Sequence, residues 1–192
     1  MLKLALAAAL VALSSAGAMA DGPFGVTMGD PITKYPSCKA GDRLAVYRCA
    51  TLPKSHPDAA AYLIMAHPST GACKVGMVSQ IVPVASDGSR LRDKADAIAA
   101  QLSKTYGRYS SKYDHVANTS LIEPRYWMYT LNSEDRSYEY YWTGDGYKNN
   151  VESISVLAKA TSASDGYVSV WIELKNFKAC KAAIEADEVQ VF

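Results

Sequence analysis

The sequence has few histidines and cysteines, no excess of charge of either sign, and only one long apolar run. Among 192 residues there are three His and four Cys, and 20 Lys and Arg balance 19 Asp and Glu. A balanced charge gives no argument for nucleic acid or anionic lipid, because both favour basic patches. After the first 20 residues, no apolar stretch approaches the roughly 20 residues that span a bilayer. We therefore expect neither nucleic-acid binding nor a membrane span.

Recognisable catalytic and metal-binding signatures are also missing. The sequence contains no G-x-S-x-G elbow, no H-E-x-x-H pair, no paired C-x-x-C motifs and no calcium-loop spacing. His56 and His67 each precede a proline, and a metal site would need a further ligand such as Asp58 or His115. Histidines on surface loops are the simpler explanation. We predict no catalytic residue, no metal and no cofactor.

The acidic residues near the aromatic segment leave one alternative open. Glu123, Glu134, Asp135 and Glu139 lie close in sequence to tyrosines and tryptophans. Such a mixture is typical of sugar-binding surfaces, and paired carboxylates can hydrolyse glycosides at separations of about 5–10 Å. A solvated face explains the same pattern more simply.

The first 20 residues have the pattern of a signal peptide. Lys3 supplies a positive charge, residues 4–13 are apolar, and Ala18-Met19-Ala20 is a small-x-small cleavage site. The residue directly after that site is Asp21 and not cysteine, so a lipid anchor is not expected. The sequence predicts a signal peptide over 1–20 and a single disulfide-bonded domain over 21–192, located in the periplasm or secreted.

Four cysteines in an exported chain predict two disulfides. They are Cys38, Cys49, Cys73 and Cys180. Four cysteines allow three pairings, and sequence alone does not choose among them. The pairing we predict is Cys38–Cys49, which closes a short loop, together with Cys73–Cys180.

The pattern of residues in the segment 71–107 predicts a strand, a turn and a helix. Apolar residues alternate from Cys73 through Val75 and Met77, which predicts a strand with these side chains on one buried face. Further along, apolar residues recur every three or four positions, at Leu91, Ala95, Ile98, Leu102 and Tyr106. This spacing predicts an amphipathic helix over about 89–106, and Gly107 stands where the helix would end.

Other segments complete an α+β prediction. Strands are expected within 43–52, 60–67, 73–81, 138–143, 154–160 and 168–174, with a helical turn over 180–186. The polar segment 108–121 reads as loop, and 123–129 as either a short helix or an extended stretch. The fold class is α+β: an antiparallel sheet of about six strands with one long amphipathic helix (about 89–106) packed on it.

The N-terminal stretch Phe24-Gly25-Val26-Thr27-Met28-Gly29-Asp30-Pro31 carries a resemblance to known proteins. It resembles the start of small exported bacterial α+β domains, most of them uncharacterised. Some of these are similar to β-lactamase-inhibitor-like domains and to binding modules of outer-membrane assembly. The resemblance implies a binding role rather than catalysis.

Aromatic residues are concentrated between positions 126 and 147. The segment contains Tyr126, Trp127, Tyr129, Tyr138, Tyr140, Tyr141, Trp142 and Tyr147. Alternation along a strand places Tyr138, Tyr140 and Trp142 on one face, which we predict to be buried, and Tyr141 on the other. Trp127, Tyr141 and Tyr147 are then the candidate binding residues, since exposed aromatics are typical of binding surfaces. Cross-strand packing that only stiffens the sheet is the alternative.

These observations favour an exported, non-catalytic binding module that engages an envelope protein or a glycan through an aromatic-rich surface. The first alternative is a small cell-envelope hydrolase with an unrecognised acidic or histidine site. The second is a structural or stress-related envelope protein without a discrete site. A concave pocket with convergent His, Asp or Glu would favour the hydrolase, and an exposed aromatic patch would favour the binding module.

Overall fold

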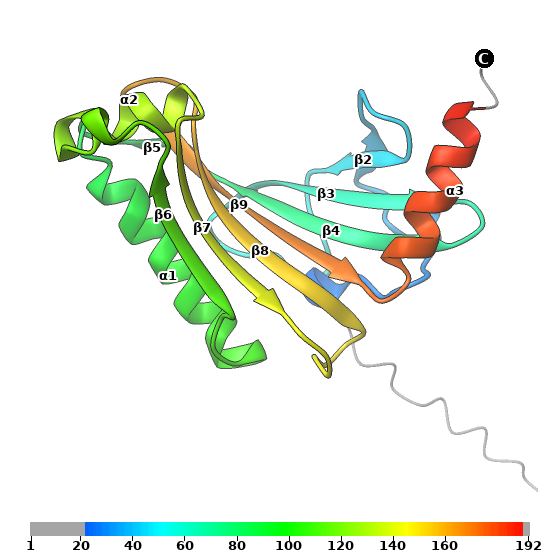
Figure 1. The fold of residues 1–192 in the computed structure, drawn as a ribbon. Coiled ribbons are helices and arrows are strands. Elements are labelled where there is room, and N and C mark those ends of the chain that lie inside the picture. Colours follow the sequence, from blue (N-terminus) through cyan, green and yellow to red (C-terminus); the bar gives the residue numbers. More distant parts are fainter. Residues whose placement is uncertain (1–21, 190–192) are drawn as a thin grey trace, which may run out of the picture.

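The structure is a computed structural model that describes residues 22–189, and it shows one antiparallel sheet with three α-helices (Figure 1). The strand order is β1-β2-β3-β4-β9-β8-β7-β6, and β5 pairs with β9. The strands are β1 Cys38–Ala40, β2 Val46–Cys49, β3 Ala59–His67, β4 Gly71–Ser79, β5 Val82–Pro83, β6 Ser111–Val116, β7 Arg136–Thr143, β8 Val151–Ala160 and β9 Asp165–Leu174. The predicted signal peptide lies outside the described residues.

The general α+β prediction is confirmed, but the sheet has nine strands rather than six. Two of the additional strands, β1 and β5, have only three and two residues, which is too short to show an alternating pattern. The third, β6, lies within 108–121, which we predicted to be loop, and that prediction is wrong. It is the last strand in the sheet order, and its largely exposed polar side chains hide the period-2 signal.

The long helix α1 (Ser89–Tyr106) forms as predicted, but it is one of three helices. It buries Leu91, Ala95, Ile98 and Ala99, and Gly107 caps its C-terminus with a positive φ of 84°. The short helix α2 (Trp127–Asn132) resolves the open choice for 123–129 in favour of a helix. The tail forms α3 (Phe177–Val189), which is longer than the helical turn we expected.

The helices lie on opposite faces of the sheet. Helix α1 contacts β5, β7, β8 and β9, and α2 contacts β7 and β8. These helices and the N-terminal segment enclose the main hydrophobic core, so we call this side of the sheet the covered face. Tyr138, Tyr140 and Trp142 all belong to this core, which confirms the predicted buried set. Helix α3 contacts β3 and β4 and packs in a separate small cluster.

A bulge in β4 explains how α3 is attached. The pairing of β3 with β4 shifts between Met65/Lys74 and Ala66/Ala72, so that Cys73 is the extra residue. Ala72 and Val75 enter the main core, whereas Cys73 packs with Cys180 and Ile184 of α3. The prediction that Cys73 shares a face with Val75 and Met77 is therefore wrong, because a bulge interrupts the alternation and re-aims one side chain.

Both predicted disulfides are present. Cys38 pairs with Cys49, and Cys73 pairs with Cys180 across a sequence separation of 107 residues. No cysteine within residues 22–189 is free. Two disulfides suggest an extracytoplasmic location, because reducing compartments keep thiols free.

The N-terminal stretch 24–31 forms a tight structure around one carboxylate. Asp30 Oδ2 accepts hydrogen bonds from Tyr35 Oη at 2.6 Å, from Lys34 Nζ at 2.9 Å and from the Thr27 backbone N–H at 3.3 Å. Partial burial alone would raise the pKa of Asp30, but the bonds from Tyr35 and Lys34 outweigh it and lower that pKa. The stretch therefore anchors the chain beside the core, where Tyr35 is buried.

Between residues 22 and 189, no helix combines the length and the apolar character needed to cross a membrane.

Candidate functional site

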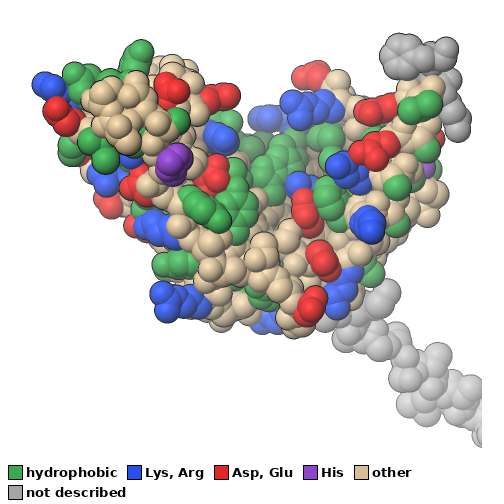
Figure 2. Space-filling model, viewed as in Figure 1, with side chains coloured by type: hydrophobic (Ala, Val, Ile, Leu, Met, Phe, Trp, Pro, Cys, Tyr) green, Lys and Arg blue, Asp and Glu red, His purple; other side chains and the backbone are tan. Residues whose placement is uncertain are grey.

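The face of the sheet opposite α1 is hollowed and largely uncovered, and we call it the open face. In Figure 1, α3 stands at one side of this face of the sheet, and β6 and β7 lie at the other side. Figure 2 shows the same view filled with side chains: hydrophobic groups line the middle of the hollow, and charged groups surround it. A concave surface of this kind, with an apolar centre and a charged rim, is where a ligand would be expected.

Strand register places one row of side chains across the whole open face. The paired positions from β6 to β2 are Ser111, Tyr141, Ser155, Trp171, Gly76, Leu63 and Arg48. The row changes in character from hydroxyl and aromatic groups on β6 and β7 to an aliphatic and then a cationic group on β3 and β2. The two ends of the open face therefore offer different chemistry to a ligand.

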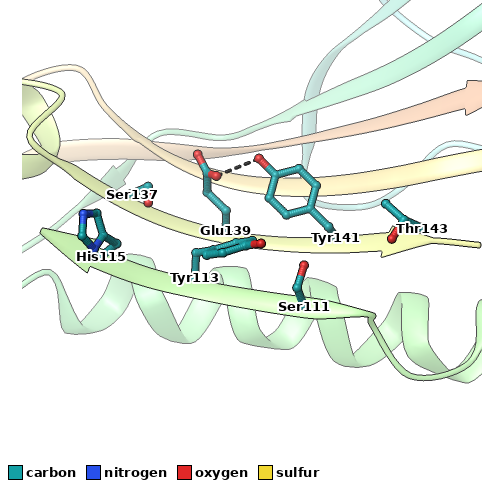
Figure 3. A pocket seen from close by; sticks show the side chains of 7 residues that line it. All are labelled: Ser111, Tyr113, His115, Ser137, Glu139, Tyr141 and Thr143. Carbon is teal, nitrogen blue, oxygen red and sulfur yellow. Dashed lines mark hydrogen bonds between the residues drawn. The ribbon is translucent and has the colours of Figure 1, made fainter. Parts of the chain in front are cut away.

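The aromatic end is a shallow hollow of about 740 Å³ over β6 and β7. Its lining residues, shown in Figure 3, are Ser111, Tyr113, His115, Ser137, Glu139, Tyr141 and Thr143. The rings of Tyr113 and Tyr141 meet edge to face with centroids 5.8 Å apart, and Tyr113 is 50% exposed. This end presents aromatic surface beside hydroxyl groups.

A hydrogen bond fixes Tyr141 within this hollow. Its hydroxyl group donates to Glu139 Oε2 at 2.7 Å (Figure 3). Partial burial, together with the negative charge of Glu139, raises the pKa of Tyr141 to about 12. The tyrosine therefore remains a neutral donor at physiological pH, and the carboxylate holds its ring in one orientation.

The centre of the open face is formed by Trp171. Its ring lies directly over Gly76, where an added Cβ would come within 2.6 Å of Trp171 Cε3. Lys74 Nζ lies 5.2 Å from the centroid of the indole ring and also contacts Glu173 Oε1 at 2.9 Å. Ser153 donates to the other oxygen of Glu173 at 2.9 Å. Gly76 thus lets the half-buried indole ring lie against the sheet, and Glu173 holds Lys74 beside that ring.

The far end of the open face is basic and aliphatic. A second hollow of about 560 Å³ is lined by Gly41, Asp42, Arg43, Val46, Arg48, Leu63, Met65, Lys74 and Trp171. Three of these side chains are cations and one is an anion. The loop that supplies Arg43 also contributes, with Phe177 and Ile184 of α3, to a neighbouring hollow. This end suits an apolar group that carries negative charge nearby.

The structure separates the three residues proposed from sequence. Tyr141 lies on the open face, as expected. Tyr147 instead packs edge to face against Tyr106 at the C-terminal end of α1, with ring centroids 6.3 Å apart. Trp127 is 3% exposed and packs against Tyr138 in the core of the covered face, so it does not belong to the open face.

Sequence reasoning missed two residues of this surface, Tyr113 and Trp171. Tyr113 lies on β6, which we took for a loop. Trp171 lies in the strand predicted over 168–174, on the face opposite Val170 and Ile172. That alternation placed its ring outside the core, and it was the available signal for a binding role.

The histidines make separate contacts. His67 Nε2 lies 2.9 Å from Asp187 Oδ2, and His56 Nε2 lies 2.9 Å from Gln101 Oε1. His115 lines the aromatic hollow, and no hydrogen bond joins it to the other residues drawn in Figure 3. Within residues 22–189, no three or more His, Cys, Asp and Glu side chains are grouped so as to hold a metal ion.

Comparisons with known proteins add no functional assignment. No protein-family model, curated protein or solved structure matches this chain significantly.

Proposed function

We propose that this protein is an exported, non-catalytic binding module whose ligand lies on the open face of the sheet. The observation that carries the proposal is the set of aromatic rings at Tyr113, Tyr141 and Trp171 on a face that the helices leave largely uncovered. Rigid amphipathic rings provide contact area at a small cost in conformational entropy. Glu139 and Gly76 pre-orient two of them.

The aliphatic side chains on the floor of the open face, next to Trp171, favour a polypeptide ligand. Leu63, Met65 and Leu157 are half-buried and point to the same face as Trp171. An aliphatic floor with charges around it matches the core and rim of a protein interface. Sugar hydroxyl groups would gain little from aliphatic side chains. The partner segment should therefore be apolar where it meets this floor.

The charges define how such a partner would lie. Glu139 is at the aromatic end, and Arg43 and Arg48 are at the other end. Complementary charges set the orientation of a bound partner and suppress alternative registers. We expect a partner with a basic group near β7 and acidic groups near β2, and we expect it in the envelope or outside the cell.

Position-specific photo-cross-linking tests this proposal. A photoreactive side chain is placed at Tyr141, at Trp171 or, as a control, at Tyr129, which is 57% exposed on α2. The three forms are irradiated with envelope fractions of the producing cell. We expect the same polypeptide adduct from positions 141 and 171 and none from 129. With that purified polypeptide, Trp171→Ala should weaken binding at least tenfold while Tyr129→Ala leaves it unchanged.

Three outcomes would contradict the proposal. Equal adducts from all three positions would indicate non-specific capture, and no adduct would leave the aromatic face without a partner. Co-sedimentation with an insoluble envelope glycan, lost in Trp171→Ala, would replace the polypeptide with a sugar ligand.

One observation supports a hydrolase as the second candidate. His115 and Glu139 line the same hollow, and a histidine with a carboxylate can act as an acid–base pair. Glu139, however, already accepts a hydrogen bond from the hydroxyl group of Tyr141. A screen with acyl-ester and glycoside model substrates, repeated with His115→Ala, tests this candidate. Turnover that His115→Ala abolishes would establish it.

A further inference from the structure

A small cavity lies at the opposite side of the sheet from the proposed ligand, where α1 begins. It has a volume of about 260 Å³ and is lined by Arg92, Asp114, Val116, Ile122, Pro124, Trp127 and Arg136. These residues come from the start of α1, the end of β6, the start of β7, the first residue of α2 and the segment that precedes α2 (Figure 1). The proposed binding function does not involve this cavity, so the two inferences stand independently.

A glycine positions the indole ring of this cavity. Gly88 has a φ of 65°, and an added Cβ would lie 1.9 Å from Trp127 Cε3. The ring is therefore held directly against the backbone at the N-terminus of α1. Its Nε1–H is buried and has no hydrogen-bond partner among residues 22–189. A buried donor of this kind usually pairs with water or an ion.

Two guanidinium groups flank the same ring and also carry unpaired donors. Arg136 is 8% exposed; its Nε donates to Thr130 Oγ1 at 3.0 Å and its Nη1 to Asp114 Oδ1 at 2.9 Å. Its Nη2 is buried and has no partner within the described chain. Arg92 Nη2 donates to the backbone oxygen of Asp87 at 3.2 Å, while its buried Nε has no partner there.

Stacking on the ring does not account for these donors. The guanidinium carbons of Arg92 and Arg136 lie 5.5 and 5.8 Å from the centroid of the Trp127 ring, so both groups contact the π system. The indole N–H lies in the ring plane, and contacts with the ring face leave it unused. Three residues of the cavity lining thus each carry a buried donor without a partner among residues 22–189, and the one carboxylate of that lining, Asp114, already accepts a hydrogen bond from Arg136.

The electrostatics of the cavity favour an anion. Two arginines face one aspartate, which leaves an excess of positive charge. The first turn of α1 contains no acidic residue, and its backbone N–H groups add the positive end of the helix dipole. The carboxylate of Asp87 already accepts hydrogen bonds from the backbone N–H and the hydroxyl group of Ser89 at this N-terminus. An anion in the cavity would add a charged partner for the buried Nε of Arg92.

We propose that this cavity binds an oxyanion group, a carboxylate or a phosphate, between Arg92 and Arg136, with the indole N–H of Trp127 as a third donor. Arginine suits both groups because its planar fork can donate two parallel hydrogen bonds. Val116, Pro124 and Ile122, which is 62% exposed, supply an apolar rim. The ligand therefore carries its anionic group on an apolar body.

Nuclear magnetic resonance of the three indole N–H groups tests this site directly. The ¹⁵N-labelled mature protein is titrated with phosphate, acetate and hexanoate at constant ionic strength, with chloride as the reference anion. Trp127→Phe identifies the Trp127 signal. We expect that signal to shift in a saturable manner, while those of Trp142 and Trp171 stay constant. Tighter binding of hexanoate than acetate supports a carboxylate on an apolar body, and tightest binding of phosphate supports a phosphate group.

Two arginine variants distinguish a specific anion site from non-specific attraction of anions to positive charge. Arg92→Gln should weaken the binding at least tenfold, and Arg90→Gln, which removes the same charge from the exposed side of the same helical turn, should not. Because Arg92 is only half-buried, its variant tests the site even if Arg136→Gln fails to fold. The absence of any saturable shift of Trp127, or equal losses in Arg90→Gln and Arg92→Gln, would overturn the proposal.

Discussion

The two faces of the sheet use the same kinds of side chain for different purposes. Tyr140 and Tyr141 are neighbours in β7, yet Tyr140 is buried beneath α1 and Tyr141 is half-exposed in the hollow. Trp142 is fully buried, whereas Trp171 on β9 lies on the open face. An aromatic residue in this protein is thus structural or available for binding according to which face of the strand it occupies.

The polar atoms of the aromatics also differ between the faces. On the covered face, the hydroxyl groups of Tyr138 and Tyr140 both donate to Asp96 Oδ1, Tyr138 at 2.6 Å, and Trp142 Nε1 donates to the Gly107 oxygen at 2.8 Å. Burial and the hydrogen bonds to Asp96 raise the pKa of both tyrosines. On the open face, the hydroxyl group of Tyr141 donates to Glu139 and to no other residue in the described part of the chain. The hydroxyl groups of Tyr138 and Tyr140 and the indole N–H of Trp142 are thus paired inside the protein, whereas the hydroxyl group of Tyr141 lies in the open hollow.

Removal of the Cys73–Cys180 disulfide should have the largest effect on stability. It ties α3 to the open side of β4 across 107 residues, so Cys73→Ala with Cys180→Ala should lower the free energy of unfolding by about 4–5 kcal/mol in the chain-entropy model. The matched control removes Cys38 and Cys49, which are 11 residues apart and should cost about 3 kcal/mol. Urea denaturation measures both, and a larger loss for the shorter loop would contradict the argument.

Truncation of one tryptophan on each face tests whether the two faces contribute differently to stability. Trp142→Ala leaves a cavity under α1 and should cost about 3–5 kcal/mol of unfolding free energy. Trp171→Ala, on the open face, should cost clearly less because its ring is only partly buried. Thermal melting and urea titration of the two variants give the difference. Equal losses would mean that the open face is as structural as the covered one.

The hydroxyl network of the covered face should have a moderate effect. Asp96→Ala leaves the hydroxyl groups of Tyr138 and Tyr140 without their shared acceptor, and we expect a loss of about 1 kcal/mol because water reaches the exposed carboxylate position. Asp93→Ala, an exposed residue of the same helix, is the control. A loss no greater than that of the control would show that water replaces Asp96 without cost.

Asp30 should confer a dependence of stability on acid pH. Its pKa is lower in the folded chain than in the unfolded chain, so its contribution is present above the unfolded value near 3.8 and is lost as the pH falls through the lower folded value. Asp30→Asn should therefore be less stable than the parent at pH 7, and the difference should shrink towards pH 2–3. Urea denaturation across this range measures it, and a constant difference would rule out this role of the charge.

The smallest stability effect is expected for Tyr141→Ala. Its ring is half-exposed, and we expect a change of about 0.5 kcal/mol or less, together with a loss of partner binding. Glu139→Gln should keep the fold and lower the pKa of Tyr141 from about 12 towards 10, because the negative charge is gone. The ¹³Cζ chemical shift of Tyr141 reports this titration. A Tyr141 variant that unfolds like Trp142→Ala would remove the main support for a binding face.

Local patterns in the sequence predicted most of the sheet and its covered face. Alternation of apolar side chains correctly separated Trp142 from Tyr141, and helical spacing correctly bounded α1. Patterns fail where the neighbours of a residue are distant in sequence. Edge strand β6 has no buried face of its own to produce a pattern. The burial of Trp127 depends on Gly88, 39 positions earlier, and nothing in the segment around Trp127 signals that contact.

The bulge at Cys73 has a mechanical consequence. Because Cys73 turns towards α3, a pull on residue 189 passes through Cys180 and its disulfide directly into β4, in the interior of the sheet. The 106 residues between the two cysteines then bear no tension along the backbone. The Cys38–Cys49 bridge shields β1 and β2 in the same way. A stretched molecule would therefore extend only outside these loops, and both proposed ligand sites would stay within or beside the unloaded part of the chain.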